Sequence, residues 1–202
     1  MAKYTPGEAF GSVTGKLYRA VAAVVNGIHT LRALPSKSSK GPSDAQKASR
    51  KRMAATVAAI RPFLNTLRNG FLRPNMIPWA LAVKANFQML SETADGGYVI
   101  LPQDIQLSNG AKQFDVKVLR NADSIELSWA VPATTNDLYG GSLFVAVHNP
   151  SNGYVAEFSS PLSAGEINLT VDSLGATEGD NLNFYSFAAT SLRSSLTAYQ
   201  LI

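Results

Sequence analysis

The chain has no cysteine and only two histidines among its 202 residues. The lack of cysteine excludes disulfide bonds, thiolate metal sites and cysteine nucleophiles. Neither His29 nor His148 has an acid and a hydroxyl near it in a recognisable catalytic spacing. A phosphate-binding glycine loop and a dinucleotide-binding fingerprint are also missing. We therefore expect a non-enzymatic protein with no catalytic residue, no metal site and no cofactor.

Long apolar runs are lacking as well. The longest, near residues 20–28, is broken by Asn26 and Gly27 and falls short of the ~20 residues that a transmembrane helix needs. The first residues contain Gly, Thr, Ser and charges where a secretory signal has an apolar stretch. These absences predict no membrane insertion, no signal peptide and a location in the cytoplasm or in a virion.

The main positive feature is a charge asymmetry. Residues 1–84 contain 14 Lys and Arg against two acids, a balance of +12, whereas residues 85–202 have 4 cations against 12 acids, a balance of −8. Such a division indicates two regions with different roles. The alternative is that each half is simply solvated and the two halves attract one another.

The first 91 residues divide into a basic arm with its linker, 1–42, and a helical segment, 43–91. Within the arm, the apolar run 17–25 and the alternation at 28–32 fit either short paired strands or helical turns. Ser43 and Gln46 form a capping box, and apolar residues then recur every three or four positions as far as Phe71. This pattern predicts a long helix.

Two breakers mark the helical segment. We expect Pro62 to kink or divide the long helix, because proline cannot donate a backbone hydrogen bond to the preceding turn. Gly70 is suited to the position just after the helix end. A second, largely apolar helix is expected at 79–90, buried between the first helix and another element.

From residue 92 the sequence alternates between apolar and polar residues and is rich in turn signals, which is typical of an antiparallel β-sandwich. The expected strands are 98–101, 105–107, 113–120, 124–131, 142–148, 154–159, 166–171, 182–189 and 196–201. The predicted fold class is α+β, with an extended N-terminal arm and helices followed by a sandwich domain at 92–202.

Several N-terminal motifs resemble a family of proteins of unknown function that is common in Bacteroidota and their phages. The motifs are Gly11-Ser12-Val13-Thr14-Gly15-Lys16, Leu31-Arg32-Ala33-Leu34-Pro35 and Gly41-Pro42-Ser43-Asp44-Ala45-Gln46. The helix at 79–90 and the strands after it also look like those of the family. Lys40-Gly41-Pro42-Ser43 departs from the family's usual turn, and the resemblance implies no activity.

The segment Ser124-Ile125-Glu126-Leu127-Ser128-Trp129-Ala130-Val131-Pro132 is similar to the second strand of fibronectin type III and immunoglobulin-like sandwiches. The resemblance implies that Trp129 belongs to the core. Sandwiches of this kind are usually interaction or spacer modules, although the fold alone does not give a function.

Our leading hypothesis is a structural component of a phage virion or related assembly, with other protein subunits as partners in a homo- or hetero-oligomer. The basic part would anchor the chain to neighbouring subunits or to nucleic acid. The expected anchoring residues are Lys16, Arg19, Arg32, Lys37, Lys40, Lys47, Arg50, Lys51, Arg52, Arg61 and Arg68.

Two alternatives remain open. One is a cytoplasmic protein that binds nucleic acid without sequence specificity. The other is a glycan- or protein-binding surface module, which requires an exposed aromatic patch with Tyr139, Tyr154 and Tyr185 as candidates.

Overall fold

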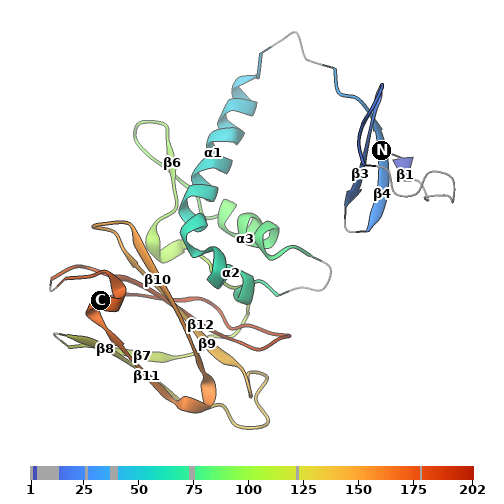
Figure 1. Cartoon of the computed structure of the whole chain (residues 1–202). Coiled ribbons are helices and arrows are strands. Elements are labelled where there is room, and N and C mark those ends of the chain that lie inside the picture. Colours follow the sequence, from blue (N-terminus) through green and yellow to red (C-terminus); the bar gives the residue numbers. More distant parts are fainter. Residues whose placement is uncertain are drawn as a thin grey trace. The chain divides into compact units, whose positions relative to one another are not determined.

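A computed structural model describes residues 2–3, 14–25, 27–36, 41–72, 76–121, 123–177 and 179–202 (Figure 1). The chain divides into two compact units, residues 1–44 and residues 45–202. The predicted α+β class, with an extended N-terminal part, helices and an antiparallel sandwich, is confirmed by the elements described below.

The N-terminal unit is a four-stranded antiparallel sheet with the strand order β1-β4-β3-β2. Its strands are β1 (Ala2–Lys3), β2 (Gly15–Leu17), β3 (Ala20–Val25) and β4 (Ile28–Ala33). Of the two readings left open for the arm, paired strands are the one that occurs. The turn between β3 and β4 contains Gly27 at φ 76°, a left-handed conformation that glycine adopts without steric cost.

The long helix forms as predicted and is divided at Pro62. Its parts are α1 (Asp44–Ile60), the 3-10 turn η1 (Arg61–Phe63) and α2 (Leu64–Gly70). Helix α3 (Pro78–Phe87) follows and ends three residues before the predicted limit. The hairpin of β5 (Ser91–Glu92) and β6 (Tyr98–Val99) and the 3-10 turn η2 (Pro102–Asp104) lead into the sandwich.

The sandwich contains two antiparallel sheets, ordered β11-β8-β7 and β10-β9-β12-β13. Its elements are β7 (Val116–Arg120), β8 (Ser124–Trp129), β9 (Ser142–Asn149), β10 (Tyr154–Pro161), η3 (Leu162–Ala164), β11 (Glu166–Thr170), η4 (Val171–Leu174), β12 (Asn183–Ala189) and β13 (Ala198–Leu201). Seven strands in facing sheets of three and four correspond to a fibronectin III or immunoglobulin-like architecture.

Two hydrophobic clusters make the second unit a three-layer structure. One cluster lies between the two sheets and includes Ile125, Leu127 and Trp129 of β8. Trp129 is buried, as predicted, and its indole Nε1–H donates to the Leu162 carbonyl at 2.9 Å. The other cluster joins the opposite face of the four-stranded sheet to the helices, which lie over β9 and β12 in Figure 1.

Strand β12 shows the effect of this layering most clearly, because all seven of its residues are buried. Phe184 and Ala188 point into the sandwich, whereas Tyr185, Phe187 and Ala189 point toward the helices. A strand covered on both faces is apolar at nearly every position. Helices and sandwich therefore share a core, and residues 45–202 pack as one unit.

A carboxylate from the sandwich completes the start of α2. That helix has no capping side chain of its own at its N-terminus. Glu157 of β10 accepts the backbone N–H of Thr66 at 2.8 Å, the Thr66 hydroxyl at 2.6 Å and the Asn65 amide at 3.0 Å. An anion at a helix N-terminus pairs with unsatisfied N–H groups and with the helix dipole. The contact fixes α2 on the sheet.

Two expectations need correction here. Residues 105–107 were predicted as a strand but pair with no strand among the described residues. The Asn86 side chain accepts the Gln106 N–H at 2.9 Å and donates to its carbonyl at 2.8 Å, so a side chain replaces the partner strand.

Gly70 is the last residue of α2 and does not follow it. Its glycine is required by close packing, because a Cβ there would lie 1.9 Å from the Leu107 carbonyl oxygen.

Candidate interaction surfaces

The described anchors of the N-terminal unit are solvent-exposed. Lys16 and Arg32 both lie opposite Val21 in the strand register, and directly paired residues of an antiparallel sheet share a face. Arg19 lies in the β2–β3 turn, where its guanidinium is 5.5 Å from the centre of the Tyr18 ring. Lys37 and Lys40 lie outside the described residues.

The opposite face of this sheet is apolar. Ala22 pairs with Leu31 and Ala20 pairs with Ala33. Ala22 is the one buried apolar side chain among the described residues of the unit, whereas Leu31 remains 37% exposed. A sheet normally buries one apolar face against another layer; among the described residues of this unit, that burial is limited to Ala22.

Five predicted anchors of the helical segment share one side of the helix; we call this surface the cationic face. The buried residues Thr56, Ile60, Phe63 and Leu67 step by four and three along the inner side. The exposed positions 47, 51, 54, 58, 61, 65 and 68 follow the same steps about half a turn away, and exposed position 50 lies four residues before 54 on the same side. The cations on this face are Lys47, Arg50, Lys51, Arg61 and Arg68.

Three acidic residues lie beside the cationic face: Asp44 in the first turn of α1, Asp95 near Lys51, and Glu157, which accepts a hydrogen bond from the Asn65 amide. Residues 45–91 contain eight Lys and Arg and no Asp or Glu. Arg50, Arg61 and Arg68 make no ion pair with any residue that the structure describes. Exposed helices usually carry both signs of charge, which gives stabilising pairs at i,i+4. The charged residues at the exposed positions of this face are all cations.

Arg52 was predicted as an anchor but lies on another side of the helix. Its guanidinium is 5.7 Å from the centre of the Phe87 ring and 5.3 Å from that of Tyr98. Cation–π contacts of this kind hold α1 to α3 and to the β5–β6 hairpin. We assign Arg52 a structural role.

The aromatic patch required by the surface-module alternative does not form from its three candidates. Tyr185 is fully buried, and its hydroxyl donates to the Pro102 carbonyl at 3.0 Å. Burial raises the pKa of this phenol far above its usual value. Tyr139 precedes the first residue of β9 and Tyr154 pairs with its last, which places them roughly 25 Å apart along the sheet.

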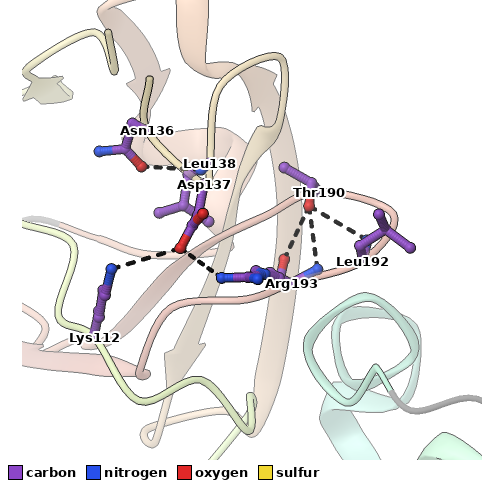
Figure 2. Close-up of polar contacts among 7 residues, drawn as sticks. All are labelled: Lys112, Asn136, Asp137, Leu138, Thr190, Leu192 and Arg193. Carbon is purple, nitrogen blue, oxygen red and sulfur yellow. Dashed lines mark hydrogen bonds and ion pairs between the residues drawn. The ribbon is translucent and has the colours of Figure 1, made fainter. Parts of the chain in front are cut away.

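One charged cluster was not predicted. Asp137 Oδ2 lies 2.6 Å from Arg193 Nη1 and 3.5 Å from Lys112 Nζ (Figure 2). Because these residues are far apart in the sequence, their contact could not be predicted from spacing. The one indication in the sequence was the scarcity of cations in the acidic half: only Lys112, Lys117, Arg120 and Arg193 occur after residue 84. Two of the four meet at this carboxylate.

The described residues hold no group of three or more His, Asp or Glu that could bind a metal ion. His148, on β9, is half-buried, and burial lowers its pKa below the ordinary value of 6.5. The Phe63 ring packs edge-on against the His148 ring, with 6.1 Å between the ring centroids. Among these residues, no helix is both long and apolar enough to cross a membrane.

No protein-family profile and no curated protein sequence matches the chain. The family resemblance of the N-terminal motifs therefore stays a prediction. Among solved structures, the fn3 domain of the human collagen alpha-1(XX) chain is 15% identical, with a TM-score of 0.35, over 47% of this chain and 86% of that one. The sandwich assignment rests on the strand pairing described above.

Proposed function

We propose that this protein is a non-enzymatic structural component of an assembly, a phage virion in the more specific form, and that it is anchored electrostatically to a polyanion. The observation that carries the proposal is the cationic face: five exposed cations on one side of a helical segment that has no acidic residue from 45 to 91. Sequence-independent attraction to phosphates needs only such an array.

The design of the face fits a nucleic acid better than a single acidic side chain. Ala54 and Ala58 are exposed between the cations, and their small side chains allow a backbone of phosphates to approach the helix closely. Arginine donates up to five hydrogen bonds and suits phosphate oxygens. Packaged nucleic acid is therefore our first candidate, and the acidic surface of a neighbouring subunit is the second.

The test is fluorescence anisotropy of the full chain with a labelled 20-base-pair duplex of random sequence, measured across a salt series. We expect weak binding that falls steeply with salt. The variant Arg50→Gln/Arg61→Gln should reduce the slope of log affinity against log salt by about 2, because each lost phosphate contact removes roughly one unit.

The matched control is Lys16→Gln/Arg32→Gln, which removes the same charge from the N-terminal sheet and should change the slope by less than half as much. An unchanged slope in the helix variant, or no binding at low salt, would overturn nucleic-acid anchoring. Light scattering on the same samples tests the second candidate: self-association that disappears in the helix variant but not in the control assigns the face to a neighbouring subunit.

A further inference from the structure

The sandwich has a preformed cavity of about 700 Å³ at one end, separate from the cationic face. Its walls come from residues 109–114 before β7, the β8–β9 loop at 133 and 135–138, the β12–β13 loop at 192–195, and Leu72 after α2. The charged cluster of Lys112, Asp137 and Arg193 lies among these walls, and Figure 2 shows the two cations on either side of the carboxylate.

The segments that carry the two cations are fixed by backbone contacts. The Leu196 N–H donates to the Lys112 carbonyl at 2.8 Å, and Thr190 exchanges hydrogen bonds with the backbone of Arg193. Gly110 has no space for a side chain, because a Cβ would lie 2.0 Å from the Ser194 carbonyl oxygen. Because these walls are already ordered, a ligand that binds in the cavity does not incur the entropic cost of ordering the loops.

The cluster has more donors than its own acid uses. Both cations contact the same oxygen, Asp137 Oδ2, whereas an ammonium offers three donors and a guanidinium five. Asn136 uses its side-chain oxygen to accept the Leu138 N–H, and its amide hydrogens make no hydrogen bond with any described residue. Two cations for one carboxylate leave a surplus of one positive charge.

Apolar groups border the same cavity. Leu192, beside Arg193, is 83% exposed at the tip of its loop, and Leu72 and Phe114 line the wall. Exposed large apolar side chains next to unused charged donors are typical of surfaces that bind other proteins. A carboxylate flanked by aliphatic groups fits this combination.

We propose that this cavity binds an acidic peptide segment of a protein partner, with its carboxylate on Lys112 and Arg193 and an apolar neighbour against Leu192. Asp137 occupies the two cations in the free protein and competes with the incoming carboxylate. The site would give the sandwich a specific protein contact in addition to the polyanion contact of the helices.

The probe is Ac-Leu-Glu-Leu-NH2, titrated into the isotopically labelled full chain while backbone amide shifts are recorded by NMR. Ac-Leu-Gln-Leu-NH2 is the uncharged control peptide. We expect shifts confined to residues that line the cavity, saturating with the Glu peptide and roughly tenfold weaker with the Gln peptide, since a hydrogen bond to a charged group is the stronger one.

Three exposed positions give variants that keep the fold. Arg193→Gln should weaken Glu-peptide binding roughly tenfold, and the control Lys117→Gln, on β7 outside the cavity, should leave it unchanged. Asp137→Asn should strengthen binding several-fold, because it removes the competing carboxylate. A merely structural role for the cluster predicts weaker binding in Asp137→Asn.

Three results would overturn the proposal. They are no saturable shift with the Glu peptide, shifts located on the cationic face instead of the cavity, or weaker binding by Asp137→Asn. Tighter binding of methyl glucuronide than of the Glu peptide would assign the carboxylate to a sugar and overturn the peptide assignment. Because the DNA assay on Arg50 and Arg61 uses other residues, failure of either proposal leaves the other standing.

Discussion

The chain contains two four-stranded antiparallel sheets that bury very different fractions of their side chains. In the sandwich sheet, β12 is buried along its whole length, with one face on the facing sheet and the other on the helices. In the N-terminal sheet, Ala22 is the one buried apolar side chain that the structure describes. Both sheets have hydrogen-bonded strands, so hydrogen bonding does not distinguish them. The difference is that the sandwich sheet is covered by a further layer on each face, which stabilises it.

The comparison also separates two kinds of surface. The second unit buries two apolar clusters and presents charge, as the cationic face and the Asp137 cluster, together with some exposed apolar side chains such as Leu192. The N-terminal unit presents apolar groups on both faces, with Leu31 on one and Val25 and Ile28 beside the cations on the other. We interpret the first as a folded body and the second as an element that gains stability from a neighbour.

The largest expected effect tests this difference with one core deletion in each sheet. Phe187, which stacks on Phe144 with centroids 5.4 Å apart, is buried, whereas Leu31 is partly exposed. Phe187→Ala should lower the free energy of unfolding by about 3–5 kcal/mol through the cavity it leaves. Leu31→Ala should lower it by less than about 1 kcal/mol in dilute protein. Urea denaturation measures both, and equal losses would remove the distinction.

A smaller effect tests whether helices and sandwich are one body. Glu157→Gln keeps the shape of the side chain but removes the charge that caps α2. We expect a loss of about 1 kcal/mol in the free energy of unfolding, measured in urea. The control is Glu166→Gln on β11, an exposed residue with no side-chain hydrogen bond to the described residues, which should change nothing. Separate unfolding transitions for the helices and for the sandwich in the wild-type protein would contradict the single body.

The smallest effect concerns pH. Because burial lowers the pKa of His148 below 6.5, the unfolded chain takes up a proton more readily than the folded one. The stability from neutral His148 is complete above pH 6.5 and declines as the pH falls through 6.5 toward the lower pKa of the folded protein. Denaturation at pH 7.5 and 5.5 should show this decline in the wild type and a flatter response in His148→Gln. Equal slopes would show that His148 is not linked to folding.

Much of the sandwich could be predicted, because its information is local. Alternation and turn residues placed β9 at 142–148 against 142–149 in the structure, and β12 at 182–189 against 183–189. The buried side of the helix followed from a spacing of three and four residues. These patterns arise from the geometry of a single element, so a single sequence contains them.

What could not be predicted depends on contacts between distant segments. The Leu107 N–H donates to the hydroxyl of Thr197, 90 residues away. This side-chain contact takes the place of a hydrogen bond to a partner strand for the segment 105–107. Arg52 reads as one more surface cation until α3 and β6 bring aromatic rings beneath it. Tyr185 alternates like an exposed strand residue, and only the helical layer buries it. The Asp137 cluster was missed for the same reason.

The cap on α2 links the order of synthesis to the order of folding. The Thr66 N–H finds its acceptor on Glu157, 91 residues later in the chain. At ~5–20 residues per second, the ribosome releases this helix several seconds before the strand that completes it. During that interval the helical segment, rich in cations and with Asp44 as its one acid, lacks the layer that covers its buried side.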